Sequence, residues 1–233
     1  MEDTGTFGGL LVDYGGVMTT SMGRAFAAFA LEAGVDPERF KAVIEEAYGG
    51  GDPDGMVARV ERGLVPQAEF ERWLAGRLSP GAAAPIAAAG LKHRLFGALE
   101  PDPDMVAAVG AARAGGIRTG LVSNSWGESG YERDRFGDLF DAVVISAEVS
   151  LRKPEPAIYV LAAERIGVPP ARCVFVDDLL HNVEGARSVG MEGIVHRSAE
   201  FTIPKLEALL GVSLARDPEA PPPRTRPSRN PMS

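Results

Sequence analysis

The chain has 233 residues, of which 45% are hydrophobic and 24% charged, and its formal net charge is −8. That length allows one α/β domain with a smaller insertion, and the excess of acidic residues argues against binding to a nucleic-acid backbone. No apolar run approaches the roughly 20 residues that span a bilayer, the first residues lack the basic stretch of a signal peptide, and the single Cys173 excludes an internal disulfide. We therefore expect a cytoplasmic protein that binds neither membrane nor nucleic acid.

Short apolar runs alternate with helical patterns along most of the chain. The predicted strands are Gly9–Val12, Ile117–Val122, Ala142–Ile145, Cys173–Val176 and Gly193–Val195. Four to six apolar residues without strict alternation are typical of strands buried on both faces. The helices predicted between and after them are Pro103–Ala114, Pro156–Ile166, Val183–Val189 and Ile203–Leu210. Strands separated by single helices predict an α/β fold with a doubly wound, Rossmann-like parallel sheet.

About 100 residues without a strand pattern lie between the first two predicted strands. They contain five helical patterns, at Met22–Ala33, Pro37–Tyr48, Met56–Glu61, Gln67–Leu78 and Ile86–Leu99. One helix is enough to connect adjacent parallel strands, so the extra helices indicate an inserted helical cap domain over residues 19–99. The core domain would comprise residues 1–18 and 100–216. Phe26, Phe29 and Leu31 are expected to contribute to the core of the cap.

The end of the chain has a different composition. Six of the 17 residues from Asp217 to Ser233 are proline, and almost none are apolar. Such a segment cannot bury a core, and we predict that residues 217–233 form a disordered, Pro-rich tail.

Residues suited to phosphate chemistry follow the predicted strands. In chain order they are Asp13, then Ser123 and Asn124, then Lys153, and finally Asp177 and Asp178. Because the carboxyl ends of parallel strands meet at one edge of a sheet, these side chains are expected to converge. A buried cluster of carboxylates needs a cation, and Mg²⁺ prefers oxygen ligands. A metal beside a lysine and a hydroxyl can hold a phosphoryl group.

This order of segments resembles the haloacid dehalogenase-like superfamily of hydrolases, over residues 10 to about 210. More narrowly, it is similar to the phosphatase-type N-terminal domain of soluble epoxide hydrolase and its bacterial relatives. The segments that carry the resemblance are Asp13-Tyr14-Gly15-Gly16-Val17, the cap stretch Gly50–Leu64, Ser123-Asn124-Ser125-Trp126, Arg152–Tyr159 and Val174-Phe175-Val176-Asp177-Asp178.

The resemblance implies a role for each candidate residue. Asp13 would be the nucleophile that forms an aspartyl-phosphate, and Lys153 would neutralise charge on both the phosphate and Asp13. Ser123 and the backbone of Asn124 would bind phosphoryl oxygens. The Mg²⁺ ligands would be Asp13, the carbonyl of Gly15 and Asp178, with Asp177 as support. The implied substrate is a small phosphorylated metabolite, and the implied assembly is a monomer or a homodimer.

One position departs from the family pattern. Phosphatases of the superfamily usually carry an acid/base aspartate two residues after the nucleophile, where this chain has Gly15. General acid–base catalysis contributes typically about 10²–10⁴-fold, so its loss predicts slow turnover, a good leaving group, or an acid supplied by the cap or the substrate.

Three other functions therefore stay open. The first is a dehalogenase, which would need no metal. The second is a phosphonate-cleaving hydrolase, which would need a Schiff-base lysine in the cap, where Lys41 and Lys92 are the lysines. The third is a catalytically weakened domain that binds a phosphorylated ligand or a partner protein.

Overall fold

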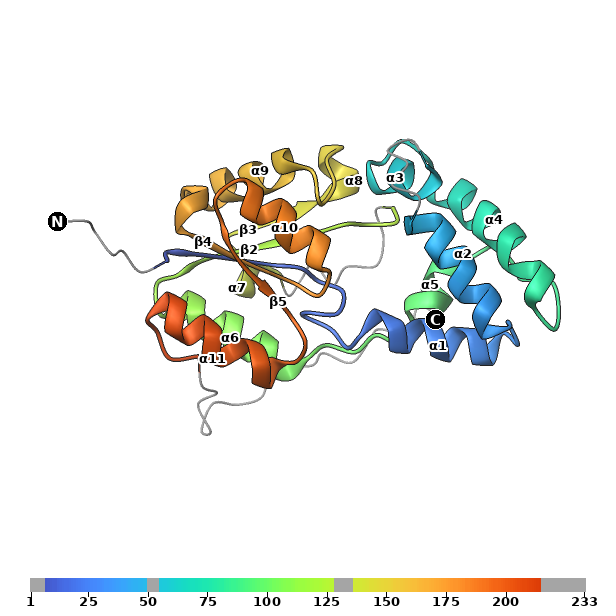
Figure 1. Ribbon diagram of the computed structural model, residues 1–233, viewed down its shortest axis with the longest axis horizontal. Coiled ribbons are helices and arrows are strands. Elements are labelled where there is room, and N and C mark those ends of the chain that lie inside the picture. The colour runs from blue at the N-terminus through green and yellow to red at the C-terminus, as the bar shows by residue number, and fades with distance from the viewer. Residues whose placement is uncertain (1–6, 50–54, 128–135, 215–233) are drawn as a thin grey trace, which may run out of the picture.

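The computed structural model describes residues 7–49, 55–127 and 136–214 (Figure 1). In these residues five strands pair in parallel in the order β3-β2-β1-β4-β5, which confirms the predicted α/β fold. Each strand lies within one residue of its predicted bounds at both ends. The strands are β1 (Gly9–Val12), β2 (Arg118–Ser123), β3 (Ala142–Ile145), β4 (Cys173–Asp177) and β5 (Glu192–Val195).

Helices cover both faces of the sheet. Helices α6 (Pro103–Ala114) and α11 (Ala199–Leu210) lie on one face, and α9 (Pro156–Ile166) and α10 (Leu180–Ser188) lie on the other (Figure 1). Successive side chains of β1 enter opposite cores, because Leu10 and Val12 join one buried cluster while Leu11 joins the other. Shorter helical segments are α7 (Phe136–Leu139), α8 (Ser146–Val149) and the 3-10 turns Ser79–Gly81 and Pro170–Arg172.

The residues between β1 and α6 form a helical layer beyond the carboxyl ends of the strands (Figure 1). Its helices are α1 (Met22–Glu32), α2 (Pro37–Gly49), α3 (Met56–Glu61), α4 (Gln67–Leu78) and α5 (Leu91–Phe96). They share a hydrophobic cluster that includes Phe29, Phe70 and Leu95, and partly buried Phe26 packs against it. The expectation for Leu31 is wrong, because its side chain is 86% exposed.

The chain enters and leaves this helical layer through two adjacent segments. Thr19 forms an antiparallel bridge with Pro101, and the Thr20 N–H donates to the Glu100 carbonyl at 2.8 Å. The Asp102 N–H donates to the Met18 carbonyl at 2.9 Å. These bonds join the two connecting segments at the base of the insertion.

Three helix predictions need correction. The helix predicted over Val183–Val189 begins at Leu180, because the N–H groups of Asn182 and Val183 donate to the Leu179 carbonyl at 3.0 and 3.2 Å. The helix predicted over Ile86–Leu99 covers only Leu91–Phe96. The residues before it are not helical, because the Arg94 guanidinium donates to the carbonyls of Ala87 and Ala89 and Gly90 adopts a left-handed conformation. The helix predicted from Ile203 begins at Ala199, since the Ser198 hydroxyl caps it by accepting the Phe201 N–H. Pro204 is therefore inside the helix rather than in its first turn.

The predicted tail over residues 217–233 lies outside the described residues, as does part of the Gly50–Leu64 stretch. Among the helices in the described part of the chain, none has the length and apolar character required to cross a membrane.

Candidate active site

The strand register places the predicted residues at one edge of the sheet. Asp13 directly follows β1, and its N–H donates to the carbonyl of Val176 in β4 at 2.9 Å. This bond continues the β1–β4 ladder and brings Asp13 beside Asp177, the last residue of β4. Ser123 is the last residue of the neighbouring strand β2 and is buried. Parallel pairing alone thus brings residues more than 100 positions apart to the same edge.

Lys153 is the cation at the centre of this arrangement. Its Nζ lies 2.7 Å from Asp13 Oδ1 and 2.6 Å from Asp177 Oδ2, and the side chain is 1% exposed. Burial alone would lower the pKa of Lys153, but the charges of Asp13 and Asp177 and their hydrogen bonds outweigh it and raise that pKa above its usual range. Lys153 is therefore a permanent ammonium that holds two carboxylates from adjacent strands.

Asp13, Asp177 and Asp178 form a compact acidic cluster. Each offers an oxygen, and these oxygens lie within 4.8 Å of one another. Burial, reinforced by Asp177 and Asp178, raises the pKa of Asp13 to about 7 although Lys153 opposes the shift. Burial and the charge of Asp177 raise the pKa of Asp178 to about 6. Three ionised carboxylates beside one ammonium leave two negative charges, so the cluster fits a hard divalent cation with oxygen ligands.

Asp177, at the end of β4, and Asp178, which follows it, differ in how many hydrogen bonds their carboxylate oxygens accept. Asp177 Oδ1 accepts the Leu179 N–H at 2.9 Å, and both oxygens of Asp177 accept from Asn182 Nδ2, at 3.0 and 3.1 Å. Asp178 instead lies against Gly16, whose φ is +81°, and a Cβ at Gly16 would overlap the Asp178 carboxylate. The oxygens of Asp177 are thus engaged in holding the site together, while Asp178 is the better candidate for a metal ligand.

Asn124 joins the end of β2 to the loop that carries Lys153. Its Oδ1 accepts the Lys153 N–H at 2.8 Å, and its Nδ2 donates to the Lys153 carbonyl at 3.0 Å. The predicted residues Asp13, Asn124, Lys153, Asp177 and Asp178 are therefore in contact or close to it. Gly15 lies next to Met22 of α1, whose sulfur would be 3.0 Å from a Cβ at that position.

The sequence reasoning missed the contacts that the helical insertion makes with this site. Glu61, the last residue of α3, is 1% exposed and accepts from Arg152 Nε at 2.6 Å and from Asn124 Nδ2 at 3.3 Å. Next to it, Arg62 pairs with Glu155. No local spacing links residues about 90 positions apart. The only signal was the pairing of opposite charges, with Glu61-Arg62 in one segment and Arg152 and Glu155 in the other.

Comparisons with known proteins agree with this architecture. Residues 8–190 match the model of the haloacid dehalogenase-like hydrolase family. Bifunctional epoxide hydrolase 2 of Sus scrofa is 28% identical over 229 residues, which are 91% of this chain and 39% of that protein. A glyceraldehyde 3-phosphate phosphatase of Methanopyrus kandleri is 34% identical over 110 residues, which are 46% of this chain and 47% of that protein. The chain thus spans less than half the length of each of these relatives.

Among solved structures, a haloacid dehalogenase-like enzyme of Bacteroides thetaiotaomicron, in complex with magnesium and inorganic phosphate, matches with a TM-score of 0.59. It is 22% identical, and the match covers 81% of this chain and 93% of that one. At this level of sequence identity, the match shows that the two chains share a fold. The family model, by contrast, covers more than half of the chain and includes the carboxyl ends of β1, β2 and β4, where the candidate residues lie. The chain belongs to the haloacid dehalogenase-like hydrolase family.

Proposed function

We propose that this hydrolase is a Mg²⁺-dependent phosphatase that acts on a small phosphorylated substrate through an aspartyl-phosphate on Asp13. The observation that carries the proposal is the Lys153 ammonium bound to both Asp13 and Asp177, with Asp178 beside them. A site with three carboxylates requires a metal to hold a further anion, whereas a dehalogenase of this family would need none. The relative named as a phosphatase and the neighbour solved with magnesium and phosphate support this choice.

Each residue would have a distinct part in the reaction. Asp13, the Gly15 carbonyl and Asp178 would hold Mg²⁺, which shields the negative charge of the phosphate from that of the nucleophile. A carboxylate oxygen of Asp13 would attack phosphorus in line, the bond to the leaving oxygen would break, and water would later hydrolyse the acyl phosphate. Lys153, the Ser123 hydroxyl and the backbone of Asn124 would bind the phosphoryl oxygens, and Asp177 would orient Lys153.

The helical insertion would act as a cap over this site. We assign residues 19–99 to the cap, and residues 1–18 and 100–216 to the core domain. Helices α1 and α3 support this division, because Met22 and Glu61 both reach residues at the carboxyl ends of the core strands. Specificity for the organic part of the substrate would then come from the cap.

Gly15 limits the substrates that the site can process. With no side chain at that position, the departing oxygen would receive no proton from the residue that usually provides one. Aryl phosphate esters and acyl phosphates, whose leaving groups are already weak bases, would therefore react faster than alkyl phosphates.

The test is phosphate release from a panel of phosphomonoesters and acyl phosphates, with and without Mg²⁺. Activity should require Mg²⁺, and Asp13→Asn should abolish it while leaving the melting temperature largely unchanged. Asp138→Asn in α7, another Asp→Asn change, serves as the matched control and should retain activity. Release that survives in Asp13→Asn would contradict the nucleophile, and no release from any compound would contradict the phosphatase.

Lys92 supports a second candidate, the cleavage of a phosphonate through a Schiff base. This lysine of α5 is 8% exposed, and burial lowers its pKa to about 8, so more of it is the neutral amine that attacks carbonyls than in an exposed lysine. Its Nζ lies 3.4 Å from the carbonyl of Gly127, four residues after Ser123. Borohydride trapping of a phosphonate with an adjacent carbonyl should label Lys92 if this reaction occurs, and an absence of label would exclude it.

A further inference from the structure

Glu61 is a buried carboxylate that the proposed chemistry does not use. It belongs to the helical insertion, yet its side chain reaches the core and is 1% exposed. Burial raises the pKa of Glu61, and the charge of Arg152 together with hydrogen bonds from Arg152 and Trp126 opposes that shift. A buried charge is costly unless it is paired, so its position beside the Lys153 loop calls for an explanation.

The first contact of Glu61 reinforces the orientation of Asn124. A carboxylate can only accept hydrogen bonds, so the amide group of Asn124 must turn its NH₂ toward Glu61, where Nδ2 lies 3.3 Å from Oε2. That orientation leaves Oδ1 free to accept the Lys153 N–H at 2.8 Å. Nδ2 also donates to the Lys153 carbonyl at 3.0 Å. Asn124 thereby bonds both the N–H and the carbonyl of Lys153, in an orientation that these two backbone groups require and that Glu61 reinforces.

The second contact holds the residue immediately before Lys153. Arg152 Nε donates to Glu61 Oε2 at 2.6 Å, and only 20% of the Arg152 side chain is exposed. One carboxylate therefore binds both the Arg152 side chain and the amide that fixes the Lys153 backbone. The Lys153 side chain in turn reaches Asp13 and Asp177.

We propose that Glu61 is a positioning residue, supplied by the helical insertion, that places Lys153 against Asp13 through Asn124 and Arg152. The inference rests on the proposed function for the role of Lys153. It makes the catalytic cation dependent on contact between insertion and core, so the phosphate-binding site is complete only when α3 is docked.

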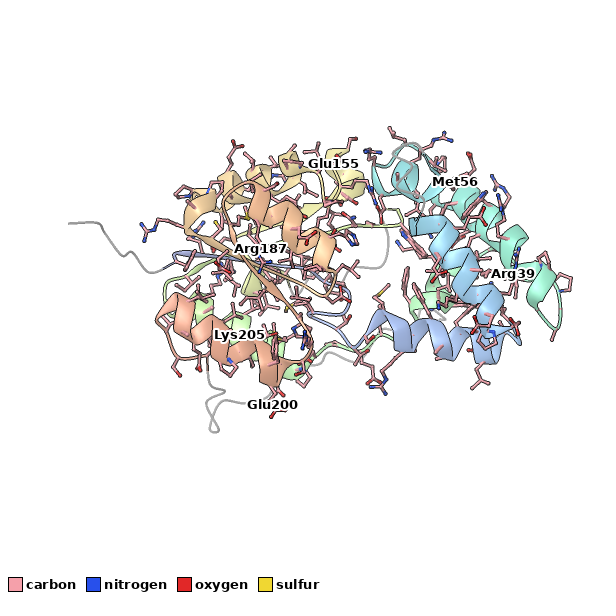
Figure 2. The ribbon with its side chains drawn as sticks, viewed as in Figure 1. Arg39, Met56, Glu155, Arg187, Glu200 and Lys205 are labelled. Carbon is pink, nitrogen blue, oxygen red and sulfur yellow. The ribbon has the colours of Figure 1, made fainter. Side chains whose placement is uncertain are left out.

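The residue that follows α3 provides a matched control. Arg62 pairs with Glu155, which lies at the start of α9 on the side that faces α3 (Figure 2). This second ion pair also joins the insertion to the Lys153 loop, but its side chains are 20% and 31% exposed, and it does not involve Asn124. Glu155 Oε2 also accepts the Arg152 N–H at 3.4 Å, a bond that the amide oxygen of a Gln can keep. If docking of α3 were all that mattered, Glu155→Gln and Glu61→Gln would have similar effects.

The first experiment compares Glu61→Gln with Glu155→Gln in Mg²⁺-dependent hydrolysis of p-nitrophenyl phosphate. Glu61→Gln should lower kcat/KM roughly tenfold or more, because a neutral amide holds Arg152 and Asn124 more weakly than the carboxylate does, and Lys153 is then less well placed against Asp13. Glu155→Gln should stay within about twofold, as expected for a partly exposed pair. In an Asn124→Ala background, Glu61→Gln should add little, since the bridge is already lost. Equal losses in the two single variants, or additive losses in the double variant, would overturn the inference.

The second experiment does not depend on turnover. Brief acetylation followed by mass spectrometry would measure the accessibility of Lys153 against exposed Lys41 as a reference. Labelling of Lys153 should rise in Glu61→Gln and stay unchanged in Glu155→Gln, and unchanged labelling in both would overturn the inference. If Glu61→Gln does not fold, Glu61→Asp replaces it in both assays, and parental behaviour there is the contradicting result. A parent enzyme that releases no phosphate would reject the proposed function, while the labelling would still decide the role of Glu61.

Discussion

Gly15 and Gly16 are adjacent in the chain, but a side chain can be accommodated at Gly15 and not at Gly16. Gly16 has a φ of +81°, and a Cβ there would overlap the Asp178 carboxylate. Gly15 lies outside the left-handed region, and its nearest obstacle is the flexible end of Met22, at 3.0 Å. A side chain at Gly16 would thus displace a metal-ligand candidate, whereas one at Gly15 requires only that a methionine shift.

This difference leads to a prediction for Gly15→Asp. The new carboxyl group would stand where related phosphatases place their acid, so release of alkyl leaving groups should accelerate by about tenfold or more. Aryl phosphates should gain much less, because their leaving groups need no proton. The measurement is kcat/KM for both ester classes, with Gly16→Ala as the variant expected to lose Mg²⁺ binding. An equal change for both classes would contradict a role in proton donation.

The raised pKa values of Asp13 and Asp178 predict a pH-dependent metal affinity. Because these values are about 7 and about 6, the metal-free site holds protons that Mg²⁺ must displace. Between the unfolded pKa near 4 and these folded values, the native state binds more protons than the unfolded state. The two groups therefore lower the stability of the metal-free protein as pH rises through that range.

Mg²⁺ should thus stabilise the protein more at about pH 8 than at about pH 5.5. At a hundredfold excess over Kd the gain is about 2.7 kcal/mol, which corresponds to roughly 5–10 °C in Tm for a chain of this size. Thermal melts at the two pH values, with and without Mg²⁺, provide the measurement. Asp178→Asn should remove most of the rise in Tm that Mg²⁺ causes. An equal rise in Tm at both pH values would show that Mg²⁺ does not compete with protons for the site.

At the scale of single elements, strand β5 shows how the sheet protects its edge. The Gly193 N–H donates to Glu192 Oε1 at 3.1 Å, and the Gly193 carbonyl accepts from Arg187 Nη2 at 2.7 Å. These two side chains occupy backbone groups that an edge strand would otherwise offer to another chain. In Figure 2 Arg187 lies beside this strand.

Removing both side chains should expose that edge. The double variant Arg187→Ala/Glu192→Ala is expected to self-associate at concentrations where the parent does not, as measured by sedimentation or light scattering. Arg197→Ala is the control, because Arg197 packs over the Phe201 ring rather than on β5. Identical sedimentation of the double variant and the parent would show that the edge needs no such protection.

For the molecule as a whole, the sequence predicts best what local patterns determine. The bounds of α6 follow from Asp102, which caps the helix by accepting the N–H groups of Asp104 and Met105, and from Pro103 in its first turn. The convergence of Asp13, Ser123 and Asp177 follows from strand order, since parallel strands end at the same edge. Neither prediction needs knowledge of how the insertion packs.

What the sequence could not predict depends on contacts between distant segments. The part of Ile86–Leu99 outside α5 is not helical, because the Arg94 side chain satisfies carbonyls that a helix would otherwise have used. Trp126 packs among the aromatic rings of the insertion, including Phe70 at 4.9 Å between ring centroids. Glu61 meets Arg152 across 91 positions. In each case the sequence supplies both partners but nothing in their spacing pairs them.

The hydrogen-bonded segments around Thr19 and Pro101 affect how the helical insertion can be replaced during evolution. Because the chain leaves and re-enters the sheet-forming part at neighbouring points, the whole stretch between them can be exchanged without altering the path of any strand. Recombination at this base could therefore give an existing hydrolytic centre a new specificity in one event. Glu61 sets the condition on such an exchange, because the incoming segment would have to bring a carboxylate to the same place.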